Sequence, residues 1–420
     1  MFNFPRYRGH GRGRGAHTPR RDAALPSDRH ILVGLSSNSL QAIPNLSTQS
    51  SDKEVKITDI RYAGSYNWME KPTPTIIIPG SPARWSNRAT PYQVHPDDGV
   101  AFKDQNGYRC PNSTLLPLIV AVDYMSNADH EEFDWAAIDF VTDRNSLRKL
   151  LRWIGGGASD FRIDTQLAGK TILLNRWENR YKEQMLGNTF GFNFERASTT
   201  TAHGCEGSTG HHRIIRYDLN GLKMVVRFEV DACIPTVTPE SSVTTPRSVS
   251  PSTTNFDDLI DALSGVSLGT TSSTAPLPGV GTFPNITIIK GGTVVPQSSL
   301  VELTTRSIRN ENSFDWKESY PQLFLSQTPH HFLAVHQYGH FHKVNKRKLD
   351  SAELNEVAAA TIQADLKKLK RALDYIKELV VKHGERGRLS LVCQEGELRV
   401  FERTSQASCL PDDILQKFDL

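Results

Sequence analysis

The stretch that decides the fold is HRIIRYDLNGLKMVVRFEVDACIP, residues 212–235. Apolar and polar residues alternate on both sides of Asn220-Gly221, a dipeptide that is favoured in type I′ turns. This pattern predicts a β-hairpin whose second arm runs through residues 222–232. Glu229 and Asp231 lie two positions apart in that arm, so we expect both carboxylates to project from one face of the strand.

A second apolar strand is predicted at SSLVELTTRS, residues 298–307, and it carries Glu302 with Thr304 on the same face. A buried carboxylate is costly unless it is paired with a cation or bound to a metal ion. Carboxylate oxygens are the ligands that hard ions such as Mg²⁺ and Mn²⁺ prefer. The acids on the two strands could therefore hold such an ion, or they could form the ordinary acidic face of half-buried strands.

The remaining regular patterns predict one mixed α/β domain, formed by residues 55–234 and 283–405. A helix is indicated between a cap at Asp143 or Asn145 and the glycines that begin at Gly155, whereas LLPLIVAVDYM (115–125) fits either a strand or a helix. The other predicted elements are a buried strand at 73–80, a hairpin at 160–177, a helix at 316–327, a hairpin at 331–344, a long helix at 351–383 and a closing hairpin at 388–403.

Three segments lack such patterns. Residues 1–54 begin with an Arg/Gly-rich stretch and continue Ser-rich, so we expect a disordered tail, with order beginning near Val55. Its arginines could contact RNA phosphates and bases, or they could simply be solvated. Residues 235–282 are rich in Ser, Thr and Pro and predict a disordered insertion, and residues 406–420 predict a C-terminal tail.

Composition excludes several classes of protein. The chain of 420 residues has 49 Lys and Arg against 46 Asp and Glu, so any contact with nucleic acid should come from local patches rather than from bulk charge. Its five cysteines form no CxxC pair, which argues against a zinc ribbon and against a disulfide framework. The sequence has neither an apolar run long enough to span a membrane nor the apolar core of a signal peptide. We therefore expect a soluble protein of the nucleus or cytoplasm.

The two acidic strands, in this order, resemble the core of the DXO family of decapping exoribonucleases. In that family a GExDC-like strand precedes an ELKT/S strand within a PD-(D/E)XK nuclease fold. Further likenesses follow the family's order along the chain: DFVTDRNSLRKLL (139–151), the hairpin at 160–177, LGNTFGFNFE (186–195), SYPQLFLSQ (319–327) and AAATIQADLKKLKRALDYI (358–376). The likeness covers residues 57–234 and 284–403, so the chain is identified as a divergent member. It implies a single PD-(D/E)XK nuclease-like domain with a central mixed sheet flanked by helices.

The resemblance also implies a site and a reaction. It implies two divalent ions, Mg²⁺ or Mn²⁺, held by Glu195, Asp231, Glu302 and the backbone carbonyl of Leu303. Glu229 would bind the second ion or orient a metal-bound water. By the same resemblance Gln322 contacts the site and Arg144 meets the 5′ end of an RNA. The implied reaction is two-metal hydrolysis of a phosphodiester at RNA 5′ ends, of the decapping or 5′-3′ exoribonuclease type.

One departure from the family pattern concerns catalysis. The family's lysine, two positions after the last carboxylate, is Thr304 here, and a hydroxyl cannot supply the missing charge. A cation could come from Arg227, Lys290 or Arg306, and Arg306 on the same strand could also contact the substrate. The alternative is a catalytically degraded RNA-binding or scaffold protein that keeps the fold. The family's glycine before the ExD motif is Phe228, a change that narrows the expected pocket.

Overall fold

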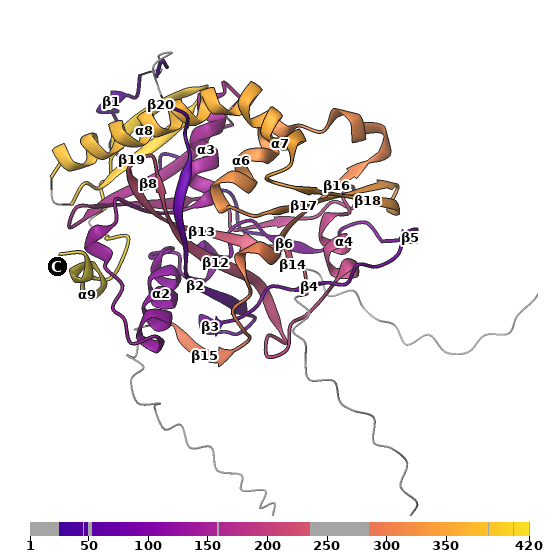
Figure 1. The fold of residues 1–420 in the computed structure, drawn as a ribbon. Coiled ribbons are helices and arrows are strands. Elements are labelled where there is room, and N and C mark those ends of the chain that lie inside the picture. The colour runs from indigo at the N-terminus through magenta and orange to yellow at the C-terminus, as the bar shows by residue number, and fades with distance from the viewer. Residues whose placement is uncertain are drawn as a thin grey trace, which may run out of the picture.

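The computed structural model describes residues 25–44, 46–48, 53–157, 159–235, 285–384, 386–405 and 407–419. The Arg-rich segment 1–24 and nearly all of the insertion predicted at 235–282 therefore lie outside the described residues. The described chain folds into two large β-sheets, with helices packed on the outer faces (Figure 1). The prediction of a mixed α/β fold is confirmed, although two large sheets take the place of the single central sheet that we expected.

Within the described residues the larger sheet has eleven strands. Their spatial order is β1 (Gln41–Ala42), β20 (Glu397–Glu402), β19 (Leu389–Gln394), β8 (Phe161–Ala168), β9 (Thr171–Trp177), β7 (Phe140–Asp143), β13 (Leu222–Val230), β12 (Ser208–Leu219), β2 (Ile57–Met69), β3 (Thr75–Pro79) and β15 (Thr287–Gly291). The sheet is mixed, because β7 runs parallel to both β9 and β13 while most other neighbours are antiparallel.

The smaller sheet has seven strands in the described chain. Their order is β11 (Thr199–Thr200), β4 (Arg84–Trp85), β14 (Ala232–Cys233), β16 (Leu300–Ser307), β17 (His330–Gln337), β18 (His340–Lys348) and β5 (Tyr92–Gln93). A separate two-stranded ribbon pairs β6 (Val100–Phe102) with β10 (Lys182–Gln184). This ribbon forms part of the wall of the site described below.

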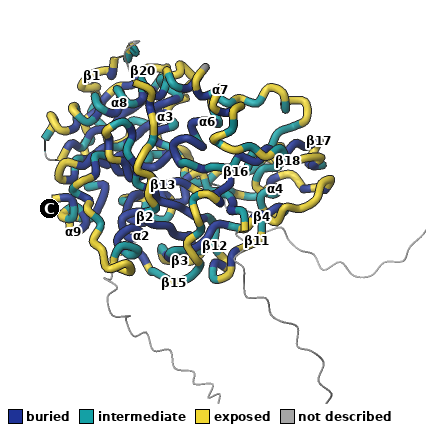
Figure 2. Tube along the Cα trace, in the orientation of Figure 1, coloured by how far each residue is buried: buried dark blue, intermediate teal, exposed yellow. Residues whose placement is uncertain are grey.

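Helices cover both faces of the larger sheet, and the helix that carries Phe194 packs against the smaller sheet. They are α1 (Gln105–Arg109), α2 (Leu116–Ala128), α3 (Arg144–Ile154), α4 (Gly191–Ser198), α6 (Trp316–Ser326), α7 (Ala352–Val357), α8 (Gln363–Lys382) and α9 (Asp412–Leu415). Successive residues of a strand point to opposite faces. Val226 accordingly packs with α3, α6 and α8, whereas Val225 packs with α2 and the C-terminal segment. Figure 2 shows the buried residues gathered in the strands and on the helix sides that face them.

The central hairpin forms as predicted. Asn220 and Gly221 both have positive φ, 47° and 90°, and Leu219 pairs with Leu222 across a two-residue turn. The ambiguous segment 115–125 becomes the helix α2, with Pro117 in its first turn. Its residues from Leu116 to Asp123 are all buried, so no polar side interrupts the apolar run and its sequence shows no helical period.

Both ends of the folded part extend beyond the boundaries expected from sequence. β1 pairs with β20, and Ile43 beside it is buried in the core, so the structure includes residues well before Val55. At the other end Leu410, Ile414 and Phe418 are buried against α2. Isolated apolar residues among polar ones give no periodic signal, which is why these segments were expected to be tails. None of the described helices is long and apolar enough to cross a membrane.

Candidate functional site

The candidate site lies where the chain passes from the larger sheet to the smaller one. β13 ends at Val230 in the larger sheet, and β14 begins at Ala232 in the smaller sheet. Asp231 is the single residue between them. β14 pairs antiparallel with β16, so the strand that carries Glu302 is brought beside this passage. The two acidic motifs predicted from sequence therefore meet at the junction of the two sheets.

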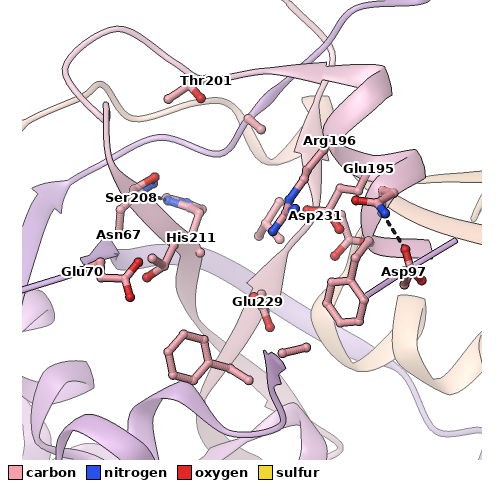
Figure 3. Close-up of a pocket in the computed structure, with 18 of the residues that line it drawn as sticks. Asn67, Glu70, Asp97, Glu195, Arg196, Thr201, Ser208, His211, Glu229 and Asp231 are labelled. Atoms are coloured by element: carbon pink, nitrogen blue, oxygen red, sulfur yellow. Dashed lines mark hydrogen bonds between the residues drawn. The ribbon is translucent and has the colours of Figure 1, made fainter. Parts of the chain in front are cut away.

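A cavity of about 550 Å³ opens at this junction, and we call it the acidic cavity. Glu195 from α4, Glu229 from β13 and Asp231 from the passage line it and project into the same hollow (Figure 3). Its other charged lining residues are Glu70, Asp97, Asp98, Lys182 and Arg196. Six carboxylates thus face two cations, and the cavity favours a positively charged ligand.

The crowding of carboxylates is visible in their pKa values. Burial, followed by the charges of Glu229 and Glu302, raises the pKa of Glu195 to about 8. Burial and the same kind of repulsion raise the pKa of Asp231 well above its ordinary value. Glu229 is open to the cavity, but the surrounding protein desolvates it and raises its pKa as well, against the opposing charge of Arg176. The nearby arginines offset the charge of the cluster only in part, so its ionised form favours a bound cation.

Glu302 lies behind the cavity wall and is 7% exposed. Arg144 donates a hydrogen bond from Nη1 to Oε2 of Glu302 at 2.9 Å, and Gln322 on α6 donates one to Oε1. The structure therefore brings both predicted site residues to this carboxylate, where Arg144 neutralises it as a buried ion pair. Among the described residues, no three His, Cys, Asp or Glu side chains stand in an arrangement that could hold a metal ion as they are.

Leu303 connects the two motifs through its backbone. Its N–H donates a hydrogen bond to Oδ2 of Asp231 at 2.7 Å. This bond favours the ionised carboxylate and opposes the upward shift of the Asp231 pKa. This bond fixes Asp231 against β16, at the residue that follows Glu302.

Thr304 faces a neutral group and not a cation. Its Oγ1 lies 3.1 Å from Nε2 of His331 on the neighbouring strand β17. His331 is 1% exposed, and burial lowers its pKa to about 4, so the imidazole is uncharged at neutral pH. Its Nδ1 has no hydrogen-bond partner in the part of the chain that the structure describes. The sequence places His331 in a histidine-rich segment, but nothing in that segment singles it out.

None of the three cations suggested to replace the family's lysine lines the acidic cavity. Arg227 makes a two-pronged ion pair with Asp143, at 2.7 and 2.9 Å, in the core. Lys290 is exposed on β15, at the outer edge of the larger sheet. Arg306 packs its guanidinium 5.4 Å from the centre of the Phe314 ring. The cations that do line the acidic cavity are Lys182 and Arg196, which sequence reasoning missed.

His211 is a second residue of the cavity wall that sequence reasoning did not select. The side-chain amide of Asn67 is held by Ser81, whose N–H donates to its oxygen and whose carbonyl accepts from its nitrogen, both at 2.9 Å. The Asn67 oxygen lies 2.7 Å from Nδ1 of His211, so the imidazole must carry its proton there. Burial, aided by Arg213, lowers the pKa of His211 to about 3. Nε2 is then a proton-free acceptor, with no partner among the described residues.

The raised carboxylate pKa values predict that the metal-free protein loses stability as pH rises from about 5 to about 8. In this range the folded state, with Glu195 at a pKa of about 8, binds more protons than the unfolded chain, where the value is 4.5. The stabilising contribution is therefore complete below the unfolded pKa and is lost as pH rises through the folded pKa. The melting temperature in EDTA should fall by several degrees across this range, and Glu195→Gln should flatten the curve. A melting temperature that rises toward pH 8 in both proteins would contradict the proton-binding account.

Comparisons with known proteins add the family and the fold. A sequence-family model described as Domain of unknown function (DUF8563) matches residues 38–419, and no curated protein matches the chain. Several solved structures share the fold, all at low identity. Rai1 of S. pombe is 12% identical with a TM-score of 0.52, covering 83% of this chain and 96% of its own.

Two further Rai1 structures cover slightly more of the chain. Candida albicans Rai1, in complex with pU5-Mn²⁺, is 12% identical with a TM-score of 0.53, covering 90% of this chain and 98% of its own. Scheffersomyces stipitis Rai1, in complex with (3′-NADP)⁺ and calcium ion, is 10% identical with a TM-score of 0.53, covering 91% and 99%. At these identities the likeness establishes a common fold, and it confirms the expected structural resemblance over most of the chain.

Proposed function

We propose that this chain, which belongs to the DUF8563 family, is a metal-dependent hydrolase that acts at RNA 5′ ends, of the decapping or 5′-3′ exoribonuclease type. One observation carries the proposal: Glu195, Glu229 and Asp231 line a single cavity, and Glu302 stands directly behind it. These acids occur along the chain in the order of the DXO family's site. The core around them is proposed to be of the PD-(D/E)XK nuclease type.

The acidic cavity has the oxygen ligands that suit a divalent cation, and its side chains would have to move closer together to coordinate one. Burial and, after it, mutual repulsion raise the pKa values of Glu195 and Asp231, and a cation of charge +2 would relieve the repulsion. Glu195, Asp231, Glu302 and the Leu303 carbonyl would hold the first ion, and Glu229 a second. Such ions would lower the pKa of an attacking water and neutralise the leaving oxygen. The Candida albicans Rai1 structure with pU5-Mn²⁺ supports both the metal and the RNA in this proposal.

The chain's own groups would bind and orient the RNA. Arg144 is buried against Glu302, and a cation near Glu302 would compete with this ion pair. The guanidinium of Arg144 would then be available to a 5′ phosphate, as the family resemblance implies. Arg196 and Lys182, which line the cavity, supply further positive charge where the phosphate chain would enter.

The second candidate function is an RNA-binding or scaffold protein that keeps the fold without the activity. Two observations favour it. Thr304 meets a neutral histidine where the family has a lysine. Glu302 is already neutralised by Arg144, so the site is held together without a metal ion. The two functions differ in whether the acidic cavity binds metal and cleaves RNA.

Calorimetric titration of the metal-free protein with Mn²⁺, followed by assays on 5′-monophosphorylated RNA, tests the proposal. We expect saturable Mn²⁺ binding that disappears in Glu195→Gln, together with Mn²⁺-dependent release of nucleotides from the 5′ end. Glu54→Gln is a matched control, because Glu54 is exposed and its carboxylate pairs with Lys56 at 3.1 Å, away from the acidic cavity. Binding of Mn²⁺ that is equal in all three proteins, or no binding at all, would reject the enzyme in favour of the RNA-binding alternative.

A further inference from the structure

A second cavity of about 750 Å³ lies next to the acidic one but shares no lining residue with it. The chain passes from one to the other between Phe102, which lines the acidic cavity, and Lys103, which lines the second. We call it the basic cavity because its lining includes Arg29, Lys103, Lys149, Arg152, Arg162 and Arg176. The acids in its lining are Asp28, Asp160 and Glu178, so cations outnumber carboxylates.

The floor of the basic cavity holds positive charge that the protein does not fully compensate. Glu178 is 5% exposed, and three cations share its carboxylate: Lys149 at 2.8 Å, Arg176 at 2.8 Å and Lys103 at 3.1 Å. Burial alone would raise the pKa of Glu178, but Lys149 and Arg176 outweigh it and lower the pKa to about 2. Arg176 has Asp104 as a second acid, 3.9 Å away. Within ion-pair distance these three cations meet two carboxylates, and Arg176 is also attracted by the more distant Asp143. The direct pairs leave one cation in excess at the floor of the cavity.

The rim of this cavity offers groups suited to a nucleotide. Arg29 lies over the rings of Trp177 and Tyr181, at 4.9 and 4.6 Å, and donates a hydrogen bond to the Glu178 carbonyl. This places a guanidinium against two half-buried aromatic rings, and arginine and aromatic side chains are the groups that contact phosphates and bases in nucleic-acid sites. Asn145 in the first turn of α3 also lines the cavity, and its side-chain oxygen is buried with no partner among the residues described. A ribose hydroxyl could satisfy that oxygen.

We propose that the basic cavity is a second binding site, which takes phosphate groups of an RNA chain or of a free nucleotide. The site needs neither metal nor cleavage, because its binding groups are the side chains of Arg29, Lys103, Lys149 and Arg176. The negatively charged cavity next to it would repel phosphate in the absence of metal. Other arginines, such as those of the N-terminal segment, could add to total binding. The difference in EDTA between the wild type and a variant of the basic cavity therefore reports on this site.

The test uses the full chain carrying Arg29→Gln and Lys103→Gln together. Lys149 and Arg176 still hold Glu178 in this variant, so the floor of the cavity is retained. A fluorescent single-stranded oligoribonucleotide, titrated in EDTA, is expected to bind about tenfold more weakly or worse at low salt. The salt slope should be smaller by about 1.4, or 0.7 for each RNA phosphate that the variant no longer neutralises. Lys56→Gln with Arg61→Gln removes the same charge from an exposed region and should bind like the wild type.

Thermal shifts with ADP separate the two sources of phosphate. Stabilisation of the wild type by ADP, but not of the Arg29/Lys103 variant, indicates a free nucleotide, whereas a response to the oligomer alone indicates an RNA chain. Either result supports the site. Equal losses of affinity in both double variants would mean that RNA binding depends only on the overall charge of the protein, and this would overturn the proposed site. Unchanged binding in the Arg29/Lys103 variant would overturn it as well. Mn²⁺ titration of the same variants keeps this outcome separate from failure of the acidic cavity, because neither Arg29 nor Lys103 lines that cavity.

Discussion

Asp231→Asn is expected to abolish Mn²⁺-dependent hydrolysis of RNA, by about a thousandfold or more, while raising the melting temperature of the metal-free protein. Asp231 is the acid fixed between the two sheets, where the Leu303 N–H and the other carboxylates meet. Its pKa is raised well above the ordinary value, so the folded state is destabilised whenever the group is ionised at neutral pH. Asparagine keeps an oxygen for the Leu303 hydrogen bond but carries no charge.

Rates on 5′-monophosphorylated RNA and melting curves in EDTA, each repeated with Mn²⁺, measure both effects. The wild type should gain melting temperature when Mn²⁺ is added, and the variant should not. Asp98→Asn is the control: Asp98 also lines the acidic cavity and is exposed at its rim, but it is not among the proposed ligands. A variant that lost both activity and metal-free stability would instead give Asp231 a structural role.

Asp231→Asn is thus expected to lower activity and to raise the stability of the metal-free protein, and both effects come from the same cluster of acids. The fold concentrates like charges in one cavity, and this concentration reduces the stability of the metal-free protein. Carboxylates with raised pKa values in a cavity are concentrated at functional sites, which favours a binding role for this cluster. Glu302 differs from the acids that line the cavity, since Arg144 and Gln322 bind its buried carboxylate and it does not face the cavity.

Local patterns in the sequence predicted the elements that carry the acids. The Asn220-Gly221 turn and the alternation around it define β12 and β13, and the apolar run around Glu302 defines β16. These signals are short-range: each depends on residues within one hairpin or strand. The order of the motifs along the chain then pointed to the fold that the Rai1 structures share.

Tertiary contacts supplied what the sequence could not. The register between β16 and β17 places His331 opposite Glu302 and within reach of Thr304. The pairing of Arg144 with Glu302 joins residues far apart in sequence, and no spacing rule links them. The sequence also did not predict that the chain passes from the larger sheet to the smaller one at Asp231, because one continuous apolar pattern runs from β13 into β14. The basic cavity likewise assembles cations from several separate segments.

Thr304→Lys is expected to raise Mn²⁺-dependent cleavage of 5′-monophosphorylated RNA by about tenfold or more, a change of about 1.4 kcal/mol in the barrier. Thr304 shares its strand face with Glu302, and the group that it contacts is the neutral His331. A lysine here would add positive charge beside the acids, where the attacking water and the scissile phosphate would lie. Initial rates at saturating Mn²⁺ measure the gain directly.

Thr304→Met isolates the charge. It removes the same hydrogen bond to His331, at a cost of about 1 kcal/mol of stability, and it has a side chain of similar reach without an ammonium group. A gain in the lysine variant alone would show that the site lacks one charged group and is otherwise complete. If the wild type cleaves rapidly and all three proteins have equal rates, the positive charge needed for catalysis would be assigned to Arg196 or Lys182, which already line the cavity. Absence of cleavage and of Mn²⁺ binding in every protein would leave the RNA-binding alternative, since charge at Thr304 serves catalysis only where the acids hold metal.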